Sequence, residues 1–65
     1  MIYILKISLR AARVNAELKQ KEAGEKIGVS LVTVLNWEKG KTVPNARQLE
    51  KICEVYGCCM DDLRF

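Results

Sequence analysis

The apolar residues near the start of this 65-residue chain recur at helical spacing. Leu9 and Ala12 are three residues apart, and Val14 is a further candidate for the inward face. Ser8 stands just before them, and a serine hydroxyl can accept a hydrogen bond from a backbone N–H of the first helical turn. We therefore expect a helix that begins after Ser8 and runs to about Asn15.

The middle of the chain carries the pattern of two short helices joined by a tight turn. Gly28 falls where one apolar stripe ends, and Ser30 falls where the next begins. Glycine tolerates the left-handed backbone that ends many helices, and serine is a good N-cap. The pattern predicts a helix-turn-helix over about residues 19–39, whose second helix occupies about 31–39. Its inward positions are Ile27, Val34 and Trp37.

The C-terminal third contains another helical stripe. Asn45 can cap a helix over residues 46–56, which Gly57 would end. Four residues at positions i, i+3, i+4 and i+7 form its apolar face: Leu49, Ile52, Cys53 and Tyr56. Residues 60–65 could add a last short helical turn, with Asp61 and Asp62 near its positive end.

These segments predict an all-α fold, a compact domain of five helices. Its 65 residues suffice for one domain (1–65) with a small core, and no repeat or low-complexity linker divides it. Residues 1–7 alternate loosely in hydropathy, so they could form an extended arm or lead into the first helix.

The apolar stretches are too short for a membrane span, which takes ~20 residues. The opening seven residues also lack the small-residue cleavage pattern of a signal peptide. We expect a cytoplasmic protein.

The net charge of +3 conceals an asymmetry along the chain. Residues 1–47 carry nine Lys/Arg against four Asp/Glu, whereas residues 48–65 carry two against four. A basic body with an acidic tail suits a protein that binds phosphates at one face. Ordinary solvated surface charge explains the same numbers nearly as well, so charge alone supports nucleic-acid binding weakly.

The residues that carry metal or catalytic chemistry are scarce. The chain has no histidine and three cysteines, Cys53, Cys58 and Cys59, an odd number in a chain that looks cytosolic. This is not the composition of a disulfide framework, and a closed zinc site would need a fourth ligand. We expect no metal, no cofactor and no enzymatic activity, because no nucleophile has a visible base and no glycine-rich phosphate loop is present. The role of Cys58 and Cys59 stays open.

A series of short motifs in fixed order runs through most of the chain: Leu9-Arg10, Gln20-x-Glu22, Glu25-Lys-Ile-Gly-Val-Ser30, Asn36-Trp-Glu-x-Gly-Lys41, Pro44, Tyr56-Gly57 and Met60-Asp-Asp-Leu63. In this order and spacing, residues from about Leu9 to Leu63 resemble the phage-repressor helix-turn-helix family, the Cro-like and lambda-repressor-like DNA-binding domains. The resemblance implies a sequence-specific transcription regulator, with repression as the expected effect. It further implies a homodimer that binds double-stranded operator DNA with two half-sites.

The resemblance also implies roles for individual residues. Matched by position, the phosphate contacts would come from Gln20, Ser30, Thr33, Lys39 and Lys41. The contacts to base edges would come from Leu31, Val32 and Asn36. Arg13 and Glu38 match a pair that forms a buried ion pair between the first and third helices of some members.

The residues themselves permit these roles without requiring them. At 100° per residue, the second helix of the motif places Leu31, Val32, Leu35, Asn36 and Lys39 within an arc of about 140°. Asparagine can pair with the N6/N7 edge of adenine, and aliphatic side chains can pack on thymine methyls. Asn36 could equally be a solvated helix residue, Gln20 a locally bonded helix-start residue, and Lys39 and Lys41 solvated loop residues.

The same helix face supports a second function class. Leu31, Val32 and Leu35 form an apolar stripe that could bind a protein, as in an antitoxin or a repressor-antagonist module. A dimer contact is expected around residues 57–60 and Phe65, although Phe65 could instead complete its own core.

Several residues depart from the family pattern, among them Lys19 and Gly24. Lys19 stands where serine or threonine commonly caps the first helix of the motif, so that cap should be weak. Gly24 replaces the usual alanine, and glycine in a helix interior costs roughly 0.5–1 kcal/mol relative to alanine.

Overall fold

The computed structural model describes residues 7–64. Within this range the elements follow the order β1 (Ile7–Ser8), α1 (Leu9–Asn15), α2 (Gln20–Ile27), α3 (Leu31–Glu38), α4 (Ala46–Tyr56), the 3₁₀ helix η1 (Met60–Asp62) and β2 (Leu63–Arg64). The all-α class is confirmed, and the four α-helices begin and end within a residue or two of their predicted bounds.

Side-chain caps explain where three of these helices begin. The Ser8 hydroxyl accepts a hydrogen bond from the Ala11 N–H, and the Ser30 hydroxyl accepts one from Thr33. The Asn45 side chain accepts a 2.8 Å hydrogen bond from the Gln48 N–H. Helix α2 has no such side-chain cap, as expected from a lysine at position 19. Instead, the Glu22 carboxylate accepts a hydrogen bond from the Lys19 backbone N–H at 3.0 Å.

One hydrogen-bond pattern ends all four helices. At the end of each helix, the N–H that follows a residue with a left-handed backbone donates to a carbonyl five residues earlier, as in a Schellman motif. These bonds are Leu18 to Arg13, Val29 to Gly24, Lys41 to Asn36 and Cys58 to Cys53. The residue directly before each donor has a left-handed backbone. These four residues are Glu17, Gly28, Gly40 and Gly57. Glu17 is the non-glycine exception, with φ of 59°.

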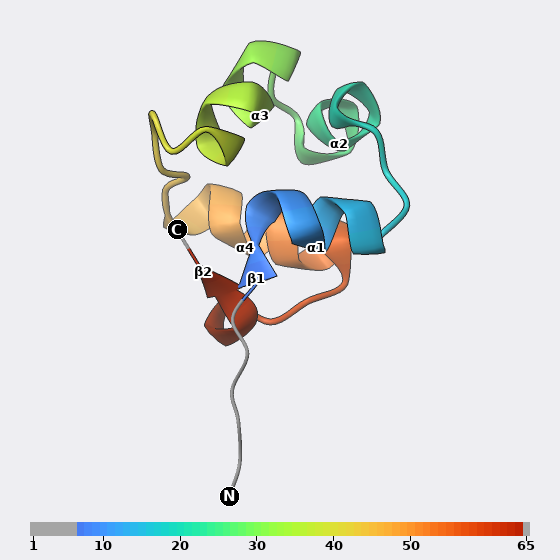
Figure 1. The fold of residues 1–65 in the computed structure, drawn as a ribbon, viewed down its shortest axis with the longest axis vertical. Helices are drawn as coiled ribbons and strands as arrows, with labels where there is room; N and C mark the ends of the chain where they lie inside the picture. The colour runs from blue at the N-terminus through green and yellow to red at the C-terminus, as the bar shows by residue number, and fades with distance from the viewer. Residues whose placement is uncertain (1–6, 65) are drawn as a thin grey trace, which may run out of the picture.

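The helices pack around one small core (Figure 1). Helices α1 and α4 lie side by side, with α2 and α3 against one side of this pair and the two strands at the other. The buried apolar side chains come from every helix and from β2: Leu9, Ala12, Ala23, Ile27, Val34, Trp37, Ile52, Tyr56 and Leu63. Among the described residues, no helix has the length and apolar character that crossing a membrane requires.

The C-terminal segment differs from the prediction. The fifth helix expected over residues 60–65 is wrong, because η1 makes a single 3₁₀ turn and the backbone then extends into β2. Strand β2 pairs in parallel with β1, with Ile7 opposite Leu63. The buried Leu63 gains a place in the core through this extension.

Two other expectations concern the N-terminal part. Of the arm predicted over residues 1–7, Ile7 belongs to β1, and residues 1–6 lie outside the described residues. Val14 does not face inward, because 55% of its surface is exposed on the outer side of α1.

Candidate nucleic-acid interface

Helix α3 is anchored by one face and exposed on another. Val34 and Trp37 are 1% and 7% exposed, so this side of the helix belongs to the core, as predicted for Trp37. On the other side, Leu31 and Val32 remain 43% and 62% exposed. A helix held in this way presents a fixed outer surface.

A buried ion pair joins α3 to α1. Arg13 Nε donates to Glu38 Oε2 at 2.7 Å, and the two side chains are only 10% and 6% exposed. Arg13 Nη2 donates to the other carboxylate oxygen at 3.3 Å, and Nη1 donates to the Leu18 carbonyl at 2.8 Å. The structure thus brings together the two residues that the resemblance pairs.

Gln20 joins the same network from the first residue of α2. Its Nε2 donates to Glu38 Oε1 at 3.1 Å, so the carboxylate of α3 is bound by side chains of both α1 and α2. The sequence left open a hydrogen bond from Gln20 to its own helix start. The structure instead joins the Gln20 amide to Glu38 of α3. The network therefore fixes three helices and one candidate phosphate contact together.

Tyr56 of α4 lies close to this network. Burial, followed by the negative charge of Glu38, raises the pKa of the Tyr56 phenol to about 12. The Arg13 charge acts in the opposite direction but does not outweigh them. Tyr56 therefore stays neutral in the folded protein well into the alkaline range.

The turn between α2 and α3 depends on Gly24. Its carbonyl accepts hydrogen bonds from both Gly28 and Val29, at 2.8 and 2.9 Å, which draws the turn tightly over the end of α2. A Cβ added at Gly24 would lie 2.9 Å from the Val29 carbonyl oxygen, closer than real Cβ contacts allow. The glycine is thus required by close backbone approach, which the sequence analysis did not anticipate.

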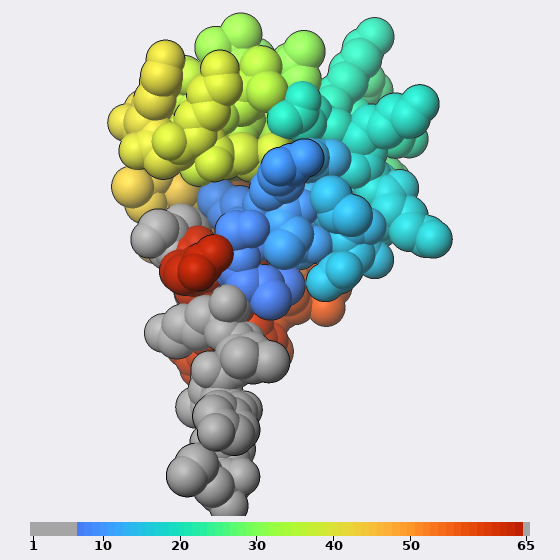
Figure 2. All heavy atoms as spheres, in the orientation of Figure 1, coloured from blue at the N-terminus to red at the C-terminus, as the bar shows by residue number. Residues whose placement is uncertain are grey.

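A crevice of about 490 Å³ opens where α1, α2 and α3 meet. Four cations line it, Arg10, Arg13, Lys19 and Lys39, and the lining is completed by Gln20, Leu35 and Glu38. Figure 2 shows this face, where the blue, cyan and yellow-green segments adjoin. Because Arg13 already neutralises Glu38, the surplus charge of the lining is positive.

Sequence reasoning missed two of these cations, Arg10 and Lys19. Both are exposed, Arg10 on the outer side of α1 and Lys19 just before α2. The signal that could have found Arg10 is its position three residues before Arg13, because residues three apart lie on the same helix face. Lys19 was considered only as a poor helix cap.

The remaining predicted residues lie at the two ends of α3. At its start, the Ser30 and Thr33 hydroxyls hydrogen-bond each other at 3.0 Å. At its end, Asn36 is half-buried and its carbonyl accepts the Lys41 N–H, while Lys39 and Lys41 are exposed. The predicted residues therefore run from the start of α3, where Leu31 and Val32 are also exposed, to the loop just past its end, with Thr33 and Asn36 within one turn of each other.

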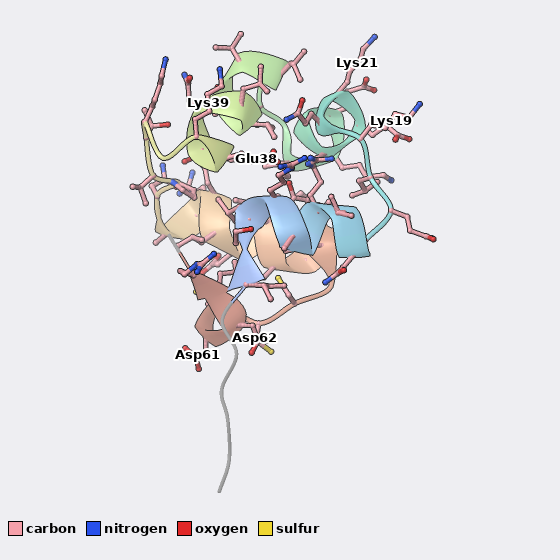
Figure 3. All side chains as sticks on the ribbon, viewed as in Figure 1. Lys19, Lys21, Glu38, Lys39, Asp61 and Asp62 are labelled. Atoms are coloured by element: carbon pink, nitrogen blue, oxygen red, sulfur yellow. The ribbon has the colours of Figure 1, made fainter. Side chains whose placement is uncertain are left out.

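Charge is distributed unevenly over the molecule (Figure 3). Lys19, Lys21 and Lys39 project from the region of α2 and α3, whereas Asp61 and Asp62 lie at the opposite end. Within residues 7–64 there is no cluster of three or more His, Cys, Asp or Glu side chains arranged to hold a metal ion. The α2–α3 end thus combines cations, amides and hydroxyls with an apolar patch, and it also carries the exposed Glu22 and Glu25 of α2.

Comparison with known proteins gives a consistent result. A family model described as helix-turn-helix matches residues 9–63. The chain is 33% identical over 55 residues to repressor protein C2 of Salmonella phage P22, and 36% identical over 55 residues to the cryptic phage CTXphi transcriptional repressor RstR of Vibrio cholerae. Each match covers 85% of this chain, but only 26% and 50% of the respective relatives.

A third relative and a solved structure are similar over most of their own length. An uncharacterized HTH-type transcriptional regulator of Archaeoglobus fulgidus is 32% identical over 59 residues, which is 84% of that protein. The crystal structure of the P22 c2 repressor protein in complex with synthetic operator 9T superposes with a TM-score of 0.76 at 32% identity. That match covers 82% of this chain and 80% of the crystallised one.

Proposed function

This chain belongs to the phage-repressor helix-turn-helix family, and from that premise we propose that it is a sequence-specific DNA-binding transcriptional repressor. Helix α3 would enter the major groove, with phosphate contacts positioning the module and contacts to base edges giving specificity. Both phage relatives are named as repressors. Because this chain spans only half or less of their length, repression by this chain is a proposal.

One observation carries this proposal most directly. Helix α3 is fixed by the buried Val34 and Trp37 and by the Glu38 network, while its opposite face is exposed beside a crevice lined with cations. Groove reading needs a rigid helix that projects from the body and cations that reach the flanking phosphates. This arrangement supplies both.

The phosphate contacts come from residues at both ends of the exposed surface. Ser30 and Thr33 lie at the start of α3, Lys39 and Lys41 at its end, and Gln20 at the start of α2. We add Arg10 and Lys19, which line the same crevice as Gln20 and Lys39. Their charges would follow the backbone of one strand beside the groove.

Base reading falls to the outer side of α3. Asn36 would pair with an adenine edge, while the exposed Leu31 and Val32 would pack on thymine methyls. Each well-formed bidentate pair typically discriminates by ~1–3 kcal/mol. Such a small number of base contacts gives one copy limited specificity.

Limited specificity per copy is the reason to expect a dimer. Two copies reading half-sites about one helical turn apart combine their contacts on one operator. We expect a homodimer that acts in the cytoplasm, where bacterial and phage operators lie. The predicted contact around residues 57–60 includes Met60, which is 43% exposed.

The test is selection of DNA from a randomised pool at several salt concentrations, with the wild type and Asn36→Ala. We expect a two-fold-related site, affinity that falls steeply with salt, and loss of preference at one position per half-site in the variant. The matched control is Asn15→Ala, which makes the same substitution on the exposed end of α1, away from α3. Absence of any enriched sequence at low salt would reject groove reading by this chain.

The exposed apolar residues of α3 favour one second candidate, a protein-binding module. Leu31 and Val32 are exposed and Leu35 is half-buried beside them, so the stripe expected from the sequence is accessible in part. Binding to a protein through this stripe would persist at high salt and would be lost in Leu35→Asp. DNA binding would show the opposite salt response.

A further inference from the structure

Cys53 and Cys58 are held together by the motif that ends α4. Cys53 lies in the last turn of the helix, Gly57 adopts a left-handed backbone with φ of 68°, and the Cys58 N–H donates to the Cys53 carbonyl at 3.1 Å. In a Schellman motif these two positions typically bring their side chains into contact. The backbone alone therefore sets the two thiols side by side.

The side chains agree with this placement. Both thiols are half-buried against the same core, and they lie near enough for each to shift the pKa of the other. Cys59, the next residue, is exposed, and all three cysteines are free thiols. The end of α2 has the same backbone motif, but there the position equivalent to Cys53 is Gly24, which has no side chain. The paired thiols are thus peculiar to the end of α4.

We propose that Cys53 and Cys58 form a reversible intrachain disulfide in the presence of a small disulfide oxidant such as oxidised glutathione. In the first step one cysteine thiolate attacks the small disulfide, which forms a mixed disulfide and releases one small thiolate. In the second step the other cysteine attacks the mixed disulfide, closes the protein disulfide and releases the second small thiolate. The two cysteines lose two electrons and two protons, and the oxidant becomes two thiols.

The environment of the thiols sets the rate of this exchange. Burial, followed by repulsion from a negatively charged Cys53 thiolate, raises the pKa of Cys58 to about 11. Burial also raises the pKa of Cys53. Since the thiolate is the nucleophile, exchange is slow near neutral pH, and the dithiol responds to a sustained oxidising environment.

The disulfide would tie the segment from η1 to β2 to the end of α4. Cys58 begins the connection to η1, and β2 ends in the parallel pair with β1. This region is at the end of the molecule opposite Lys19 and Lys21, so the inference does not depend on the proposed DNA contacts (Figure 3). Oxidation would stabilise the fold and leave the α3 surface in place.

The experiment uses Cys59→Ser, which replaces the exposed cysteine and leaves the pair intact. The full chain is equilibrated with glutathione buffers of increasing oxidised fraction, quenched with acid, alkylated and weighed by mass spectrometry. We expect the mass of a single chain with no intermolecular disulfide, which takes up no alkyl group and has lost two hydrogen atoms. After reduction the same chain should take up two alkyl groups. We also expect Tm to rise by roughly 5–10 °C on oxidation, as for a short closed loop in a small domain.

Cys58→Ala in the Cys59→Ser background is the matched control. It should show neither the mass change nor the Tm change while keeping the helical circular dichroism of its parent. Recovery of Cys59→Ser with two free thiols at every oxidised fraction would overturn the proposal. Recovery of only glutathionylated or intermolecularly bridged chains would overturn it as well.

Discussion

At the scale of single residues, Gly24 shows how a tertiary contact can reverse a propensity argument. Sequence reasoning assigns this glycine a cost within α2, since alanine is the better helix former. The structure places the Val29 carbonyl oxygen where an alanine Cβ would lie, 2.9 Å away. Backbone cannot move aside as a flexible side chain can, so the close approach decides the preferred residue.

Gly24→Ala is therefore expected to destabilise the fold by about 1–3 kcal/mol, as overpacking does, despite its better propensity. Urea unfolding followed by circular dichroism measures the change. Glu25→Ala, at the exposed neighbouring position of α2, is the control and should stay within about 0.5 kcal/mol of the wild type. A Gly24→Ala variant more stable than the wild type would contradict the clash.

Tyr56 yields a residue-scale prediction about pH. The phenol has a pKa raised from 10.0 to about 12 in the folded protein, so the unfolded chain releases this proton first as the pH rises. The stabilisation is complete below pH 10 and is lost as the pH rises towards 12, with about 1 kcal/mol gone near pH 11. Other groups titrate there too, so unfolding of the wild type is compared with that of Tyr56→Phe. The difference in stability between them should change over this pH range and be constant below it.

At the scale of elements, the helices were predictable because their signals are local. Ser8, Ser30 and Asn45 each cap a helix within three residues of themselves, and Gly28 and Gly57 end helices through nearby carbonyls. The parallel pair of β1 and β2 was not predictable. Each strand has two residues, too few for an alternating pattern, and its partner lies at the other end of the chain.

The candidate site divides in the same way. The buried face of α3 follows from its periodicity, as Trp37 shows, and Ser30 follows from its capping position. The crevice that gathers Arg10 and Lys19 arises from the packing of three helices, which no local pattern encodes. The bond from Gln20 to Glu38 likewise joins residues 18 apart in the sequence.

The Arg13–Glu38 pair is the contact between elements with the clearest consequence. Glu38→Ala leaves a buried guanidinium without its carboxylate and should destabilise the fold by about 3–5 kcal/mol. The double variant Arg13→Met/Glu38→Ala removes both charges and should be less destabilised than the sum of its single variants. A double-mutant cycle with urea unfolding measures this coupling, and additive effects of the two sites would show that the ion pair does not act as a unit.

At the scale of the whole molecule, Lys19, Lys21 and Lys39 lie at the α2–α3 end, whereas Asp61 and Asp62 lie at the η1 end (Figure 3). If Arg10 and Lys19 each neutralise a phosphate, Arg10→Gln and Lys19→Gln should each reduce the slope of log affinity against log salt by about 1. Sequence preference should be unchanged, because phosphate contacts carry no direct sequence information. Lys51→Gln on α4, outside this crevice, makes the same change in charge and should leave the slope unaltered.

The parallel strand pair also bears on the order of folding. Ile7 and Leu63 are partners across 56 intervening steps of the chain, so the ladder closes a loop that contains every helix. Closing so long a loop before the helices have docked would cost chain entropy with few contacts in return. The helical body should therefore assemble first and the ladder last. In native-state hydrogen exchange the ladder amides should open more readily than those of α4, so the two strands can fray while the helices stay docked.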